Sequence, residues 1–98
     1  MNNKQAREIA WNFVRQYRPI LVGAYLFGST VEGKLYPRDV DLLLIKKDGA
    51  RINFRGFPEL DKINYIVYRE SYAREMLERK VGDWRFYKKV LDTGERLI

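Results

Sequence analysis

The feature that most constrains this chain lies within residues 25–45, where a short polar loop joins two apolar runs. The first run ends at Gly28-Ser29, and the second opens with Asp39, a valine and Asp41. Because alternate residues of a β-strand share a face, we expect the two aspartates to point the same way. Two carboxylates about 6–7 Å apart on one face repel each other unless a cation lies between them. Since hard cations prefer oxygen ligands, the pattern predicts a Mg²⁺ site.

A phosphate-binding turn is expected beside these carboxylates. A glycine directly after a strand allows a tight turn, and free N–H groups together with a serine hydroxyl can bind phosphate oxygens. Thr30 to Lys34 is expected to begin a short helix whose N-terminus faces the phosphates. Lys34 and Arg38 could pair with a triphosphate, although either fits an exposed surface position equally well. Alone, Gly28-Ser29 would be an ordinary turn after a strand, and it is the downstream aspartates that favour a phosphate site.

The glycine–serine turn, the short loop and the Asp-x-Asp pair followed by aliphatic residues resemble the signature of the DNA-polymerase-beta-like nucleotidyltransferases. The resemblance is most specific within residues 27–45 and extends over residues 5–98. The length of the chain is similar to that of the minimal nucleotidyltransferases, the small partners of HEPN-domain proteins in prokaryotic toxin–antitoxin pairs. The resemblance implies an α/β (α+β) fold, with helices packed on a small mixed β-sheet. The length of 98 residues suffices for one domain with one modest core, so we expect residues 1–98 to form a single domain.

The resemblance further implies a Mg²⁺-dependent enzyme that moves a nucleoside monophosphate, expected to be AMP from ATP, to a hydroxyl of a protein or RNA partner. Asp39 and Asp41 would be the catalytic residues and would hold the metal in a two-metal site. Nucleotide contacts are expected from residues in and after the turn, namely Gly28, Ser29, Thr30 and Lys34. The implied protein partner is HEPN-like, with this chain as the antitoxin. The oligomeric state stays open, a homodimer included.

The chain departs from this family at the third carboxylate. The family takes that group from an apolar–Asp–apolar position on a later strand, and Ile63-Asn64-Tyr65 matches it with asparagine instead. Asp61 is the nearest carboxylate, but its strand parity is opposite, so it could substitute only if the start of the strand turns it round. Asn64 can offer a carbonyl oxygen to a metal but cannot act as a general base. The alternative function is therefore a catalytically impaired nucleotide-binding or antitoxin module that acts by binding its partner.

The amino-acid composition limits the kinds of functional site that this chain can form. The 98 residues include no cysteine and no histidine, which excludes disulfides, thiolate zinc sites and histidine bases. A net charge of +6 would attract nucleotides or RNA, although the basic residues are scattered among acids as on an ordinary solvated surface. No apolar run is long enough to span a membrane, and the polar N-terminal segment lacks the apolar middle of a signal peptide, so we expect no membrane partner. The absence of cysteine suits a cytoplasmic protein.

Local patterns predict the other elements. Helices are expected where apolar residues recur at helical spacing, at 4–18, at 72–81 with Ser71 as its cap, and between Asp83 and Gly94. Strands are expected at 20–27, 39–46, 51–54, 62–68 and 96–98. The Asp48-Gly49 turn signal is expected to return 51–54 as an antiparallel partner of the preceding strand. If the sheet order follows that of the family that the chain resembles, the loop at 55–60 would overhang the site and make Arg51 and Arg55 possible phosphate contacts.

Overall fold

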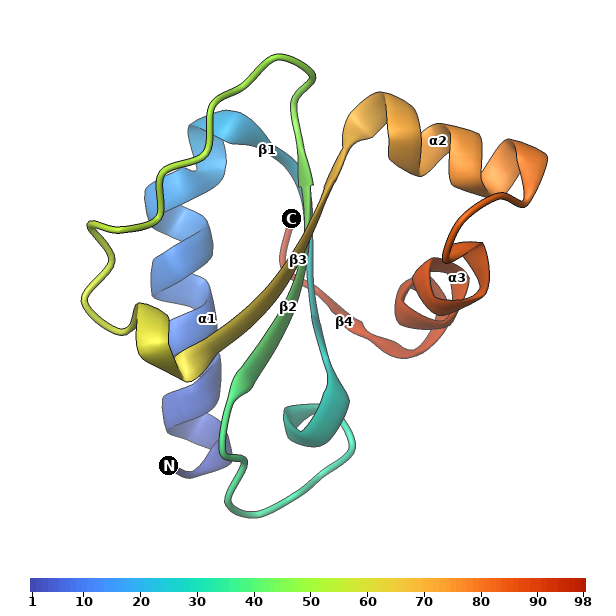
Figure 1. The fold of residues 1–98 in the computed structure, drawn as a ribbon. Helices are drawn as coiled ribbons and strands as arrows, with labels where there is room; N and C mark the ends of the chain where they lie inside the picture. The colour runs from blue at the N-terminus through green and yellow to red at the C-terminus, as the bar shows by residue number, and fades with distance from the viewer.

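A four-stranded mixed β-sheet, in the strand order β3-β2-β1-β4, lies at the centre of the fold (Figure 1). The computed structural model describes the whole chain, from Met1 to Ile98. The helices and strands are α1 (Asn3–Tyr17), β1 (Leu21–Phe27), β2 (Val40–Lys46), β3 (Ile63–Arg69), α2 (Glu70–Arg79), α3 (Trp84–Thr93) and β4 (Glu95–Arg96). Three short 3₁₀ turns flank the strands: η1 (Arg18–Ile20), η2 (Gly28–Thr30) and η3 (Leu60–Lys62). The predicted fold class, a small mixed sheet with helices packed on it, is confirmed.

Strand β2 determines how the sheet is put together, because it pairs antiparallel with β1 and parallel with β3. Phe27 at the end of β1 is level with Asp41, and Asp41 is level with Asn64 of β3. The short strand β4 pairs antiparallel with the other side of β1. The last residues of β1 and the first residues of β2 and β3 therefore meet at one end of the sheet.

Apolar side chains are buried on both faces of this sheet. Helix α1 packs on one face, while α2 and α3 pack on the other (Figure 1). The cluster on the α1 face contains 15 buried residues, including Leu42 and Leu44 of β2, whereas that on the opposite face contains 6, including Leu43. Because neighbouring residues of a strand point to opposite faces, β2 supplies both clusters and is apolar throughout its middle.

Helix α1 begins and ends close to the predicted residues. The Asn2 side chain accepts a hydrogen bond from the Gln5 N–H (2.8 Å), and the Gln5 side chain accepts one from the Asn2 N–H (2.9 Å). This reciprocal capping box satisfies two N–H groups that the first turn leaves free. Pro19 follows the helix and cannot continue its hydrogen-bonding pattern.

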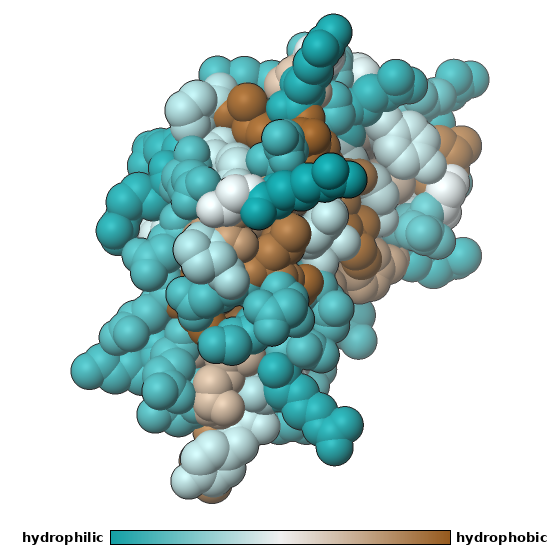
Figure 2. All heavy atoms as spheres, turned by 60° about the vertical axis from the view of Figure 1, so that its left-hand side comes forward, coloured by the Kyte–Doolittle hydropathy of each residue, from teal (hydrophilic) through white to brown (hydrophobic).

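The outer surface on the α1 side is mostly hydrophilic. Figure 2 shows hydrophilic side chains over most of this view, with apolar atoms confined to patches between them. Trp11, which the helical spacing places off the buried stripe of α1, is 42% exposed. None of the helices combines the length and the apolar composition needed to cross a membrane.

The predicted strand at residues 51–54 is wrong. Because β2 and β3 run in parallel, the chain must return from one end of the sheet to the other, and residues 47–59 make this connection without forming a strand. Phe54 and Phe57 within it are buried against Phe13 of α1, with ring centroids 4.9 and 5.1 Å from that of Phe13. Packing of these rings on α1 outweighs the turn signal, which predicts only a local reversal.

The predicted capping role of Ser71 is also wrong. Helix α2 begins at Glu70, and its N-cap residue Arg69 makes no side-chain capping bond. Instead, the N–H and the hydroxyl of Ser71 both donate to Asp48 Oδ1, each at 3.1 Å. The carboxylate that caps the helix thus comes from the turn after β2, which local sequence spacing does not reveal.

Candidate metal and nucleotide site

Polar side chains gather where the end of β1 meets the starts of β2 and β3, at the lower end of the sheet in Figure 1. The turn η2 follows β1 directly, and a loop from Val31 to Asp39 then leads into β2. The helix predicted from Thr30 to Lys34 is replaced by η2, which starts earlier, at Gly28, and is only one turn long. The turn and both aspartates are therefore held by neighbouring strands.

The two aspartates converge on the side chain of Asn64. Asn64 Nδ2 donates to Asp39 Oδ2 at 3.2 Å and to Asp41 Oδ1 at 3.4 Å. The shared donor shows that the two carboxylates lie on the same side, as strand parity predicts. Parallel pairing of β2 with β3 brings Asn64 level with Asp41, so asparagine occupies the position beside the pair. Asp61 lies in η3, before β3, and is exposed.

Gly28 allows the Asp41 carboxylate to lie directly against the main chain. Its φ of +75° is a conformation that residues with a side chain rarely adopt, and a Cβ here would collide with Asp41 Oδ2. The main chain of Ser29 interacts with the Asp41 carboxylate and lowers its pKa, against the effect of burial, which raises it. The glycine–serine turn thus orients a carboxylate, a role that the sequence reasoning missed because it assigned the N–H groups of the turn to phosphate.

Other acidic side chains lie close enough to Asp41 to affect its pKa. Burial raises the pKa of the Asp41 carboxyl, and the charges of Asp39 and Glu32 raise it further. A hydrogen bond from Asn64 and the contact with the Ser29 main chain oppose this effect and lower the pKa. Glu32 was not among the predicted residues, because its place beside Asp41 depends on how η2 folds back. A bound cation would relieve the repulsion between these acidic groups.

A cavity of about 260 Å³, here called the carboxylate pocket, opens over this cluster. It is lined by residues from the turn, the loop and β2, namely Ser29, Lys34, Tyr36, Pro37, Arg38, Asp39 and Asp41. Lys34 and Arg38 therefore lie beside the carboxylates, where they can neutralise a polyphosphate. The pocket lining does not include Arg51 and Arg55, which lie within the connection that packs on α1.

Thr30 lies beneath the site. The whole residue, main chain included, is 1% exposed, and Oγ1 is buried without a hydrogen-bond partner. Thr30 therefore has no accessible atom for the predicted nucleotide contact in this arrangement. The structure brings Ser29 and Lys34 to the carboxylate pocket, while Gly28 lies at its edge against Asp41.

The donor set at this end of the sheet fits one Mg²⁺ ion. Mg²⁺ in proteins is commonly bound by one or two carboxylates, with substrate phosphates and water completing the octahedron. Asp39 and Asp41 supply two converging carboxylates, and the Asn64 amide adjoins both. No group of three Asp, Glu, His or Cys side chains in the chain is placed to hold a metal. The second ion of the expected two-metal site would thus have no third carboxylate, and it stays a prediction.

The mixed sheet, its strand order and its covering helices define a nucleotidyltransferase-like fold. A proposed nucleotidyltransferase from Sulfolobus solfataricus has a similar structure, with a TM-score of 0.53 over 83% of this chain and 78% of that chain. The two chains are 22% identical, and at this level the likeness shows the fold alone. No protein-family model matches the chain. No curated protein matches it either.

Proposed function

We propose that this protein is a Mg²⁺-dependent nucleotidyltransferase that moves a nucleoside monophosphate, AMP from ATP, to a hydroxyl of another molecule. The observation that carries the proposal is the convergence of Asp39 and Asp41 beside the Gly28-Ser29 turn, in a pocket that also contains Lys34. Paired carboxylates next to basic groups are what transfer from a nucleoside triphosphate requires, since this chemistry needs mainly positioning and charge neutralisation.

In the proposed reaction, an acceptor hydroxyl oxygen attacks the α-phosphorus, and pyrophosphate leaves as the new phosphodiester bond forms. Asp39 and Asp41 would hold Mg²⁺, which would supply charge neutralisation for the triphosphate and the leaving group. Lys34 and Arg38 pair with phosphate oxygens, and the Ser29 hydroxyl donates to them. The acceptor proton passes to solvent or to a base on the partner, because the Asn64 amide cannot accept it.

The acceptor is proposed to be a protein or RNA, with a HEPN-like toxin as the protein candidate. Two neighbouring side chains on the loop beside the pocket support a macromolecular acceptor, since Leu35 is 77% and Tyr36 is 78% exposed. Exposed large apolar groups at the rim of a site are typical of contact surfaces. In this scheme the loop binds the acceptor while the carboxylate pocket binds the triphosphate.

A second candidate function is a binding module with little or no transferase activity. Asn64 favours it, because a neutral amide lies beside Asp41 at the position where a third carboxylate would complete the site. Loss of general-base help typically lowers a rate by about 10²–10⁴-fold. Such a protein would keep Mg²⁺–nucleotide binding and would act by holding its HEPN-like partner.

Transfer of label from α-labelled ATP tests the proposal. The protein is incubated with Mg²⁺ and with candidate acceptors, including a HEPN-like partner and RNA, and an Asp39→Asn/Asp41→Asn variant of verified fold serves as the blank. We expect label on an acceptor only with the intact aspartates. Binding of Mg²⁺–ATP without transfer would favour the binding module. Absence of both transfer and binding would contradict the assignment of the site.

A further inference from the structure

A second cavity lies on the other side of Gly28, between η2 and α3, and we call it the α3 cavity. Its volume is about 410 Å³, within the range of about 300–1,000 Å³ that is usual for small-molecule sites. Gly28 lines this cavity and also touches the Asp41 carboxylate with its main chain. The two cavities share no lining residue, but Gly28 lines the α3 cavity and the next residue, Ser29, lines the carboxylate pocket, so the cavities are neighbours across this turn.

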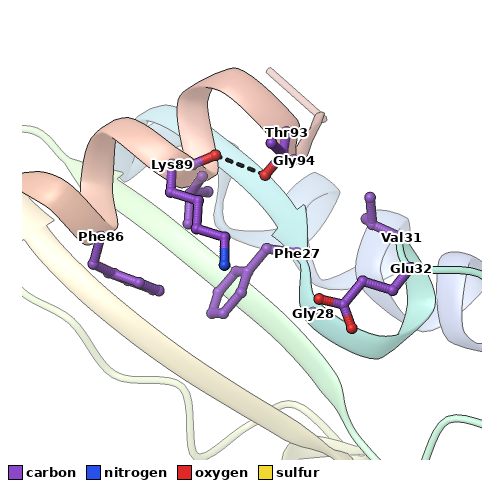
Figure 3. A pocket seen from close by; sticks show the side chains of 9 residues that line it. Phe27, Gly28, Val31, Glu32, Phe86, Lys89, Thr93 and Gly94 are labelled. Carbon is purple, nitrogen blue, oxygen red and sulfur yellow. Dashed lines mark hydrogen bonds between the residues drawn. The ribbon is translucent and has the colours of Figure 1, made fainter.

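Aromatic and aliphatic side chains form the walls of the α3 cavity, contributed by Phe27, Val31, Phe86 and Val90. The rings of Phe27 and Phe86 meet edge to face, with centroids 5.4 Å apart and an interplanar angle of 77°. In this arrangement the two rings do not stack on each other, so a ring face stays available to a flat ligand. Figure 3 shows both rings on the same side of the space.

Polar groups complete the lining of the α3 cavity. Lys89 extends from α3 toward Phe27, and Glu32 approaches from the turn side (Figure 3). The Thr93 hydroxyl donates to the Lys89 carbonyl oxygen at 2.7 Å, which leaves the Thr93 oxygen free to accept a hydrogen bond. The cavity thus combines flat apolar walls with one cation, one carboxylate and one hydroxyl acceptor.

We infer that the α3 cavity binds the nucleoside part of the triphosphate whose phosphates occupy the carboxylate pocket. The base would stack against Phe86 and receive a hydrogen bond from Lys89, while ribose hydroxyls would donate to Glu32. Base stacking on an aromatic side chain tolerates any base, because every base has a flat π-face. The inference rests on the proposed function, because it takes the triphosphate site as given.

Calorimetric titrations with Mg²⁺–ATP and with Mg²⁺–tripolyphosphate distinguish binding in the α3 cavity from binding in the carboxylate pocket. The intact protein is expected to bind ATP more tightly than tripolyphosphate, which lacks the nucleoside. Phe86→Ala should weaken ATP binding about tenfold, in line with the usual loss on removal of a stacking ring, and leave tripolyphosphate binding unchanged. Trp84→Ala is the matched control, since Trp84 lies on the same helix but lines a different hollow.

Lys89→Met and Lys88→Met form a second pair that should leave the fold intact, because both lysines are exposed on α3. Only Lys89 lines the α3 cavity, whereas Lys88 lines the hollow beside Trp84. Both variants remove one positive charge, so only a nucleoside contact distinguishes them. We expect weaker ATP binding with Lys89→Met alone. Equal affinities for ATP and tripolyphosphate, or equal losses in both members of a pair, would overturn the inference and leave the proposed function standing. Failure of the intact protein to bind either ligand would overturn both.

Discussion

At the scale of single residues, Asn64 has the most consequential position in the site. Its amide donates to both Asp39 and Asp41, so it offsets part of the repulsion between the two carboxylates while no cation is bound. An aspartate at the same position would add a third negative charge and a third oxygen ligand. The identity of this one side chain therefore sets the balance between stability without metal and affinity for metal.

Asn64→Asp is expected to strengthen Mg²⁺ binding and, if the protein is a transferase, to raise the transfer rate by up to about 10²-fold through general-base help. Calorimetry with Mg²⁺ and the α-labelled ATP assay measure the two effects. Asn53→Asp, which adds the same charge on the exposed connection between β2 and β3, serves as the control. An unchanged transfer rate would mean that another group, on the partner or in solvent, supplies the base.

Asp41→Asn is expected to increase the free energy of unfolding in EDTA at pH 7. The pKa of Asp41 is raised by burial and by the charges of Asp39 and Glu32, so the charged form is disfavoured in the folded state. The stability associated with Asp41 is therefore highest at low pH and is lost as the pH rises through its folded-state pKa. A neutral amide removes that loss.

Urea denaturation with and without Mg²⁺ tests this expectation. Mg²⁺ should stabilise the intact protein and leave the Asp41→Asn variant unchanged. Glu8→Gln removes an exposed carboxylate from α1 and is expected to have little effect in either condition. A variant less stable than the intact protein in EDTA would show that hydrogen bonds to Asp41 outweigh the repulsion.

At the scale of elements, the sequence predicts the helices and strands whose apolar spacing is regular. It does not predict features that depend on contacts between segments far apart in the chain. The strands β1, β2 and β3 and the three helices lie close to their predicted ranges, because their apolar spacing is regular. The parallel pairing of β2 with β3 could not be predicted from local pattern, because the connection between the two strands packs through Phe54 and Phe57 on the distant helix α1.

The residues of the candidate site also fall into those that the sequence predicts and those that it does not. Strand parity predicts that Asp39 and Asp41 share a side, and the motif places Ser29 and Lys34 near them. Neither the approach of Glu32 nor the burial of Thr30 has a signal in the sequence, because both depend on how η2 packs against the sheet. The α3 cavity combines η2 with a helix more than fifty residues further along the chain, so local pattern could not predict it.

Helix α2 offers a test of capping from a distant turn. The Ser71 N–H is the main cause that lowers the pKa of Asp48, with further lowering by the Ser71 hydroxyl. A carboxylate with a lowered folded-state pKa stabilises the protein above its unfolded-state pKa, and the stabilisation is lost as the pH falls through the folded-state value. Asp48→Asn should therefore destabilise the protein at pH 7 and make stability less dependent on pH in the acidic range.

Denaturation at several values between neutral and acidic pH measures this dependence. Ser71→Ala removes only the hydroxyl donor and keeps the N–H, so it should have a smaller effect than Asp48→Asn. Identical pH profiles for the intact protein and the Asp48→Asn variant would contradict a capping role for this carboxylate.

At the scale of the whole molecule, the two faces of the sheet are unequal. The α1 face holds a cluster of 15 buried residues, whereas α2 and α3 share a cluster of 6. Since less buried apolar contact gives a lower free energy of local opening, α2 and α3 should open more often than α1 and the central strands. Hydrogen exchange should therefore be faster at their main-chain amides. Equal protection on both faces would contradict this ranking.

The smaller core also gives the α3 cavity a second role. A nucleoside bound there would fill space between η2 and α3 and add apolar contact to the face that has less of it. The bound nucleoside would then contribute apolar contacts that the smaller core lacks. Its binding could be measured as slower opening of α3. Mg²⁺–ATP should slow amide exchange in α3, whereas Mg²⁺–tripolyphosphate, which cannot fill the cavity, should leave it unchanged. The face of the sheet covered by α2 and α3, which we expect to open most easily, would then also be the face whose amide exchange changes when substrate binds.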